Sequence, residues 1–226
     1  MALYAIGDVH GCARTLAALL DRIGPGPDDT VVFVGDYVDR GPDSKGVIDQ
    51  LIALAPHTQA VFLRGNHEAL LLSCYDRATD TLLADPEALD LWHANGGDAA
   101  LRSYPGRTIS PEHLAFLRTT RLYYDTPDFF FVHAGLHPLH SIVENIRYGT
   151  SETFLWTREH LRVPEAQRAW EKPVVCGHTP QAEPISEPRL LMIDTGCVFA
   201  NRRQDLGRLC AVQLPERTFY FERYQG

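Results

Sequence analysis

Short apolar runs rich in β-branched and aromatic residues recur along the chain, and amphipathic stretches separate the early ones. Their length and nearly continuous hydrophobicity are typical of strands that are covered on both faces. The pattern predicts strands at residues 3–6, 31–34, 60–63, 129–132, 174–176 and 190–193.

Helical periodicity links the first three predicted strands. Residues 15–23 place Leu16, Leu19, Leu20 and Ile23 on one face, and residues 44–54 repeat this spacing, so the chain begins β-α-β-α-β. Three further helices are expected within a mostly helical insert at about residues 68–120, and strands are expected to dominate from residue 121. We expect one domain over residues 1–226, with helices at 68–77, 86–93 and 111–119 and a terminal hairpin of 208–214 and 218–223.

Composition narrows the functional classes. The chain has 21 basic and 29 acidic side chains and a net charge of −8, which disfavours a general nucleic-acid or membrane-surface binder. The five cysteines form no C-x-x-C pair, so a disulfide framework and a thiolate zinc site are both disfavoured. No apolar stretch is long enough for a membrane span, and we expect a soluble cytoplasmic protein without nucleic-acid or membrane partners.

Polar residues cluster directly after the predicted strands. The sequence GDVHG follows the first strand, GDYVDRGPDS the second and GNHE the third, and HAG and GHTP follow two later strands. Ligands of open α/β sheets bind beyond the carboxyl ends of the strands, so these side chains are expected to share one site. The set is Asp8, His10, Asp36, Asn66, His67, His133 and His178.

Apart from His67, the donor types in this set favour a particular class of metal. Two aspartates, one asparagine and three histidines suit Mn²⁺, Fe or Zn²⁺ better than Ca²⁺ or a thiolate zinc site. Six ligands exceed the need of one tetrahedral ion, so two ions sharing Asp36 are expected. Two divalent ions with two aspartates leave a cationic pocket, which indicates a phosphate ester or anhydride as substrate and a metal-bridging water as nucleophile.

Three neighbouring residues could protonate the leaving group and bind the phosphate in such a reaction. His67 follows the ligand Asn66 and can protonate a leaving oxygen, with Asp39 orienting its other ring nitrogen. Arg40 can form paired hydrogen bonds to phosphate oxygens. The alternative for Asp39 and Arg40 is an ion pair in a polar surface turn.

The five motifs together, over residues 7–180, resemble the phosphoprotein phosphatase family of metallophosphoesterases, and especially its short bacterial and phage serine/threonine phosphatases. The resemblance implies an α+β, calcineurin-like metallophosphoesterase fold, a two-sheet β-sandwich flanked by helices in four α/β/β/α layers. It implies one metal on Asp8, His10 and Asp36. A second metal is implied on Asp36, Asn66, His133 and His178, with Mn²⁺ favoured over Fe and Zn²⁺ for both sites.

Family roles make His67 the general acid, Asp39 its partner and Arg40 a phosphate clamp. The stretch FLWTR resembles the segment that carries the second phosphate-binding arginine, which gives Arg158 that role, with Arg147 and Arg162 as alternatives.

The resemblance implies hydrolysis of phosphoserine and phosphothreonine in proteins by a metal-bridging hydroxide, with a phosphorylated protein or peptide as partner and no regulatory subunit. The alternative is symmetrical cleavage of diadenosine tetraphosphate or another small phosphoester. VDRGP and GNHE favour the protein phosphatase over the symmetrical enzymes, which resemble VARGP and GNHD at these places. A scaffold that binds phosphorylated partners without turnover is a third possibility, disfavoured because the predicted acid and ligands are all present.

Overall fold

The computed structural model describes residues 1–83 and 85–226, so residue 84 of the predicted insert lies outside the described residues. The first of two five-stranded sheets has the order β10-β9-β1-β2-β3. The neighbours β1, β2 and β3 run parallel, and β9 runs antiparallel to both β1 and β10. Its strands are β1 (Leu3–Ile6), β2 (Thr30–Phe33), β3 (Gln59–Phe62), β9 (Arg208–Leu214) and β10 (Thr218–Arg223).

The second sheet has the order β4-β5-β6-β8-β7, and its three central strands are parallel. The outer strands β4 and β7 pair antiparallel with their neighbours. The strands are β4 (Tyr123–Asp125), β5 (Phe130–Val132), β6 (Val174–Cys176), β7 (Ile185–Glu187) and β8 (Leu190–Met192).

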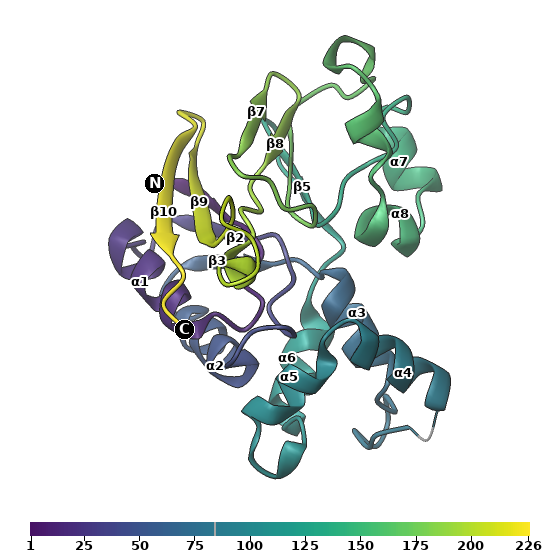
Figure 1. Ribbon diagram of the computed structural model, residues 1–226. Helices are drawn as coiled ribbons and strands as arrows, with labels where there is room; N and C mark the ends of the chain where they lie inside the picture. The colour runs from purple at the N-terminus through teal and green to yellow at the C-terminus, as the bar shows by residue number, and fades with distance from the viewer. Residues whose placement is uncertain (84) are drawn as a thin grey trace.

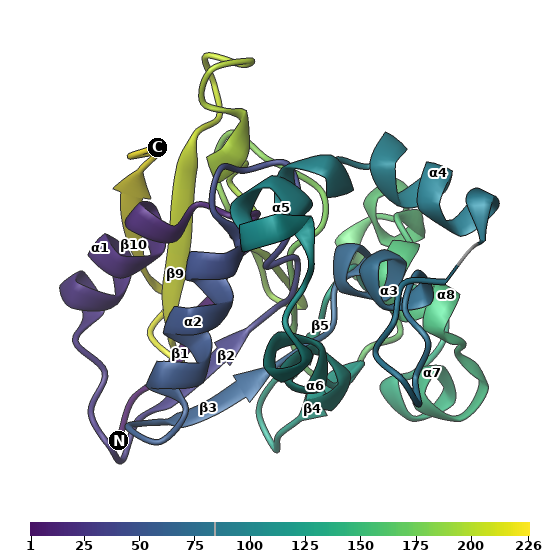
Figure 2. The same ribbon diagram turned by 90° about the horizontal axis from the view of Figure 1, so that it is seen from below.

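Helices cover the outer faces of both sheets (Figure 1). The pair α1 and α2 lies beside the first sheet, α7 and α8 lie beyond the second, and α3 to α6 lie at one end (Figure 2). The helices are α1 (Ala13–Ile23), α2 (Ser44–Leu54), α3 (Asn66–Ser73), α4 (Pro86–Ala94), α5 (Gly97–Ser103), α6 (Pro111–Thr119), α7 (Ile142–Tyr148) and α8 (Ser151–Trp156).

Strand alternation divides the apolar side chains among three cores. In β1, Tyr4 and Ile6 pack with the helices, whereas Ala5 faces the second sheet. In β5, Phe131 joins the core between the sheets and Phe130 joins the core under α7 and α8. Full burial of one such large side chain contributes about 1.5–3 kcal/mol to folding. The predicted two-sheet sandwich flanked by helices is therefore confirmed.

The second half of the chain contains two helices that the sequence did not predict. Strands predominate after residue 121, as expected, but the short helices α7 and α8 follow β5, with 3₁₀ turns at Glu159–Arg162 and Glu165–Gln167. These helices are too short for a 3.6-residue pattern to emerge. Local hydrogen bonds start α7, where Ser141 Oγ accepts from the backbone N–H of Glu144 and the Glu144 carboxylate accepts from that of Ser141.

Predicted boundaries in the first half shift by small amounts. The strands β2 and β3 begin and end one residue earlier than expected, and α3 covers Asn66–Ser73 rather than residues 68–77. Between β3 and β4 the main described elements are the helices α3 to α6, in agreement with the predicted helical insert. The assignment of the whole chain to one domain stays a prediction. No helix in the described part of the chain combines the length and apolarity needed to cross a bilayer.

The carboxyl ends of the two sets of parallel strands meet. A Cβ on Gly7, after β1, would collide with the carbonyl oxygen of Ile193, after β8. A Cβ on Gly177, after β6, would collide with the Asp8 carboxylate, so both positions require glycine for this close approach. The sandwich thus brings loops from both sheets to one edge.

Candidate metal centre and active site

The loops at this edge adopt strained backbone conformations. Left-handed φ values occur at His10 (45°), Asp36 (53°), Asp39 (70°), Arg40 (66°) and His178 (66°). For residues with a side chain this region costs roughly 1–2 kcal/mol each, and such strain persists where the surrounding structure holds it. All five belong to the predicted site, so the strain is concentrated where the side chains converge.

One group of donor atoms forms around His133. Its Nε2 atom lies 3.0 Å from Asn66 Oδ1, 3.1 Å from His178 Nδ1 and 3.4 Å from Asp36 Oδ1. The other ring nitrogen, Nδ1, lies 2.9 Å from the Val34 carbonyl oxygen. A carbonyl can only accept, so Nδ1 carries the proton and Nε2 presents a lone pair to the group. Electron-pair donors that face one another in a buried space fit a cation among them.

A second group forms on the other side of the same aspartate. His10 Nε2 lies 3.4 Å from Asp36 Oδ2, and His10 Nδ1 donates to the Val38 carbonyl over 2.9 Å. Asp8 Oδ2 accepts from the backbone N–H of His178 over 2.9 Å, whereas its Oδ1 is buried without a partner among the described residues. Each oxygen of Asp36 therefore faces one group, the arrangement of a bridging ligand between two ions.

The position of His67 adds a second interpretation of the donor group around His10. The compact His/Asp triads are His10–Asp36–His67 and Asp36–His133–His178. Thus His67, rather than Asp8, completes the first triad by distance, with Nε2 4.0 Å from Asp36 Oδ2. The ligand and acid assignments of Asp8 and His67 stay predictions, and metal analysis of their variants separates them.

Burial and charge prepare these groups to bind cations. Burial lowers the pKa of His10 and His133, and it lowers the pKa of His178 to about 2, so all three rings are neutral and able to ligate. Burial alone would raise the pKa of Asp36, but positive charge on the surrounding histidines acts in the opposite direction and, whenever those rings are protonated, holds the pKa well below its usual range. Burial and then the charges of two nearby aspartates raise the pKa of Asp8, the effect that a bound cation would relieve.

His67 is held in a buried hydrogen-bonded chain. Its Nδ1 lies 2.7 Å from Asp39 Oδ2, and Trp92 Nε1 donates to both Asp39 oxygens over 3.0 and 3.1 Å. Burial lowers the pKa of His67, but the charges of Asp36 and Asp39 outweigh it and leave the pKa above its ordinary value. Nε2, the free ring nitrogen, is buried without a hydrogen-bond partner in the described part of the chain. The arrangement suits a proton donor oriented by a carboxylate.

Two arginines reach the donor groups. Arg40 Nη1 lies 2.7 Å from His10 Nε2, and the Arg40 backbone N–H donates to the Gly96 carbonyl over 3.2 Å. A metal on His10 Nε2 therefore requires the Arg40 guanidinium to move off this nitrogen. Arg158 Nε donates over 3.2 Å to Thr179 Oγ1, next to His178.

The alternatives to Arg158 lie elsewhere. Arg147 is exposed and packs against the Tyr148 ring, 5.4 Å from its centroid, and Arg162 is exposed in a 3₁₀ turn. Of the three candidates, Arg158 is the one with a hydrogen bond to a site loop in the described structure.

Glu68 has a structural role that the sequence did not reveal. Its Oε2 accepts from the backbone N–H groups of Asp36 and Gly65, both over 2.8 Å. Its Oε1 accepts from those of Tyr37 over 2.7 Å and Val38 over 3.3 Å. Burial and the Asp36 charge raise its pKa to about 7. The final residue of GNHE thus fixes the loop that carries Asp36, and Trp92, which had no signal in the sequence, fixes Asp39.

Glu68→Gln is expected to destabilise the fold by about 3 kcal/mol or more. One oxygen becomes an NH₂ group that faces two backbone donors, and each buried unsatisfied donor costs about 1–3 kcal/mol. Urea unfolding followed by circular dichroism measures the change, with the exposed Glu216→Gln as a matched control that is expected to be neutral. Equal stability of both variants would show that Glu68 does not hold the loop.

Comparison with known proteins agrees with this geometry. Residues 1–202 match the family model of the calcineurin-like phosphoesterases. The chain is 30% identical to an asymmetrical bis(5′-nucleosyl)-tetraphosphatase of Oceanobacillus iheyensis, over 97% of this chain and 91% of the relative. It is 29% identical to a symmetrical bis(5′-nucleosyl)-tetraphosphatase of Aromatoleum aromaticum, over 97% and 96%. It is 28% identical to serine/threonine-protein phosphatase 1 of Salmonella typhimurium, over 88% of each chain.

Solved structures share the fold. The crystal structure of a putative diadenosine tetraphosphatase covers 100% of this chain and 94% of its own, with a TM-score of 0.70 and 24% identity. At this identity the likeness concerns the fold alone. The near-complete family match makes the protein a hydrolase of the metallophosphoesterase superfamily. The chain belongs to the calcineurin-like phosphoesterase family.

Proposed function

We propose that this protein is a metal-dependent hydrolase that cleaves the phosphoanhydride chain of bis(5′-nucleosyl) tetraphosphates. Its similarity to both asymmetrical and symmetrical tetraphosphatases extends over nearly the whole chain. The structural observation that carries the proposal is that arginines flank the donor groups on two sides, with Arg40 beside His10 and Arg158 beside the loop of His178. A chain of phosphates presents negative charge on both sides of the bond that is cut, and it matches this arrangement.

The side chains of the site have separate roles in this reaction. Arg40 and Arg158 bind phosphate oxygens and orient the bond to be cut. His67 delivers the proton on Nε2 to the leaving oxygen, and Asp39, held by Trp92, keeps the ring in place. Divalent ions, when bound by the two donor groups, supply an acidified water and neutralise phosphate charge.

The second candidate is hydrolysis of phosphoserine and phosphothreonine in proteins, with a phosphorylated protein or peptide as partner. The VDRGP and GNHE sequences and the likeness to the Salmonella typhimurium phosphatase favour it. A buried proton donor also suits the poor alkoxide leaving group of such substrates. The likeness to an asymmetrical tetraphosphatase, which extends over 97% of this chain, nevertheless favours the anhydride as the substrate.

The cofactor we propose is a pair of Mn²⁺ ions, because oxygen and imidazole donors without thiolates suit this metal, as they also suit Fe and Zn²⁺. We also propose a cytoplasmic location. All five cysteines are free and buried, as is typical of proteins in a reducing compartment.

A substrate panel tests the proposed reaction. With Mn²⁺ present, kcat/KM for diadenosine tetraphosphate is expected to exceed that for a phosphothreonine peptide by at least about tenfold, a difference of 1.4 kcal/mol in transition-state binding. Chromatography of the products distinguishes ATP plus AMP from two molecules of ADP. Asp36→Asn protein, purified in parallel, controls for contaminating phosphatases. A tenfold preference for the peptide would establish the second candidate instead.

A further inference from the structure

Two adjoining hollows open beside Arg40, between α5 and the segment after the 3₁₀ turn Cys197–Phe199. Their volumes are about 280 and 350 Å³. They share the lining residues Arg40, Ala99, Arg102 and Arg202, and so form one continuous depression, which we call the arginine hollow.

The arginine hollow carries a local excess of positive charge in a protein of net charge −8. Arg102 pairs with Asp98, which also lines the hollow, over 3.1 Å. Arg202 is exposed and has no acidic partner in the described part of the chain. Three arginines thus face one carboxylate, and the surplus favours binding of an anion.

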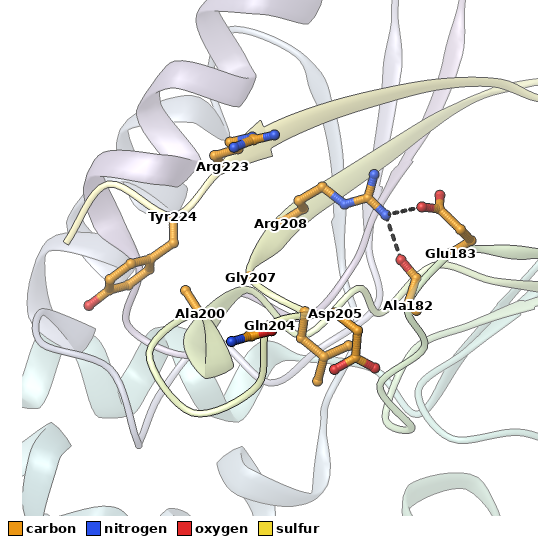
Figure 3. A pocket seen from close by; sticks show the side chains of 10 residues that line it. Ala182, Glu183, Ala200, Gln204, Asp205, Gly207, Arg208, Arg223 and Tyr224 are labelled. Atoms are coloured by element: carbon orange, nitrogen blue, oxygen red, sulfur yellow. Dashed lines mark hydrogen bonds and ion pairs between the residues drawn. The ribbon is translucent and has the colours of Figure 1, made fainter.

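The larger pocket on the neighbouring surface lacks this surplus. Its volume is about 550 Å³. Arg208 donates hydrogen bonds to the Glu183 carboxylate, over 2.8 Å, and to the Ala182 carbonyl oxygen. Figure 3 shows both contacts. The lining of this pocket holds two arginines, Arg208 and Arg223, and two carboxylates, Glu183 and Asp205, so it has no formal excess of positive charge. The arginine hollow is therefore distinguished from the larger pocket by its charge and not by its volume.

Arg40 connects the arginine hollow to the donor groups. Its guanidinium contacts His10 Nε2, while its backbone is tied to Gly96, at the start of α5. The guanidinium also lies over the Phe199 ring, 5.6 Å from its centroid. Arg40 therefore borders both the donor group around His10 and the arginine hollow.

We propose that the arginine hollow binds the phosphates of the substrate that lie beyond the one attacked, with Arg102 and Arg202 as the residues that select a polyphosphate chain. Planar guanidinium groups form paired hydrogen bonds to phosphate oxygens, and several arginines along one depression match several phosphates in a row. A simple monophosphate ester has no second phosphate to fill the hollow. This inference rests on the proposed function, because it names the part of the site that distinguishes a nucleoside polyphosphate from other phosphate esters.

The test compares Arg202→Ala with Arg203→Ala. The two variants remove the same charge from adjacent positions, but Arg203 is paired with Asp205 and does not line the hollow. For Arg202→Ala we expect KM for diadenosine tetraphosphate to rise about tenfold with kcat nearly unchanged, because the lost contact is the same in ground and transition states. Hydrolysis of p-nitrophenyl phosphate is expected to stay unchanged in both variants.

Inhibition by inorganic tripolyphosphate provides a readout that does not depend on nucleotide turnover. With p-nitrophenyl phosphate as substrate, Ki for tripolyphosphate is expected to rise about tenfold in Arg202→Ala and to stay at the wild-type value in Arg203→Ala. Equal Ki values in the two variants overturn the inference.

Failure of the inference and failure of the proposed function give different results. If diadenosine tetraphosphate is cleaved with the same KM by wild type and Arg202→Ala, the hollow has no role in selection while the proposed function stands. If diadenosine tetraphosphate is not cleaved but tripolyphosphate loses inhibition selectively in Arg202→Ala, the anion site stands and the proposed function fails.

Discussion

Asp36→Asn is expected to lose both metal ions and to reduce kcat by about 10³-fold or more. The Asp36 oxygens face different donor groups, with Oδ1 3.4 Å from His133 Nε2 and Oδ2 3.4 Å from His10 Nε2. An amide has one oxygen and no charge, so it cannot serve both groups as a carboxylate does. Bound ions contribute several kcal/mol of charge stabilisation, and each 1.36 kcal/mol changes the rate tenfold.

Metal content of this variant is measured by mass spectrometry after gel filtration, together with phosphate release. Asp90→Asn is the matched control, because Asp90 is exposed on α4, and it is expected to keep wild-type metal and activity. Loss of only one ion from Asp36→Asn would contradict a bridging role, and retention of both would remove Asp36 from the metal centre.

His67→Asn is expected to keep the metals and reduce kcat by about 10²–10⁴-fold, the range for loss of a positioned general acid. His67 Nδ1 is engaged with Asp39, which leaves Nε2 as the nitrogen able to give a proton. The loss is expected to be largest for alkoxide leaving groups and smaller for phosphate or p-nitrophenolate, which are less basic and depend less on protonation. Rates for phosphothreonine peptide, diadenosine tetraphosphate and p-nitrophenyl phosphate measure this gradient.

Metal analysis of the same variant distinguishes the two interpretations of the donor group around His10. If His67→Asn loses metal as severely as Asp36→Asn, whereas Asp8→Asn keeps it, then His67 is the ligand that completes the His10 triad and the acid assignment fails. The predicted assignment requires the opposite pattern, with metal lost from Asp8→Asn and retained in His67→Asn.

The fold was largely predictable where hydrophobic patterns are long or repeated. Buried parallel strands such as β1 and β6, and amphipathic helices such as α2, have the expected bounds because burial dictates their apolar residues. The short edge strands β4 and β7 and the helices α5, α7 and α8 were not predicted. Elements this short are held by tertiary packing and caps, such as Phe154 against the second sheet, rather than by periodicity.

The candidate site was predictable because the polar residues that form it lie in the loops directly after the parallel strands. The residues chosen from the sequence converge, and five of them occupy left-handed backbone positions that no propensity favours. The contacts that hold them come from positions without such a signal: Trp92 reaches Asp39 from α4, and the Gly96 carbonyl binds the Arg40 backbone. These contacts depend on how the helical insert folds back on the sheet edge, which a single sequence does not encode as a local pattern.

The central claim is that two divalent ions shared by Asp36 are needed for phosphate hydrolysis. Removal and return of metal tests it most directly, with ions counted per chain by mass spectrometry and hydrolysis of p-nitrophenyl phosphate followed at each step. We expect the active protein to hold two ions per chain, to lose activity when a chelator removes them, and to regain it as Mn²⁺ returns to that ratio. Undiminished hydrolysis by protein that holds well under one ion per chain would contradict the claim.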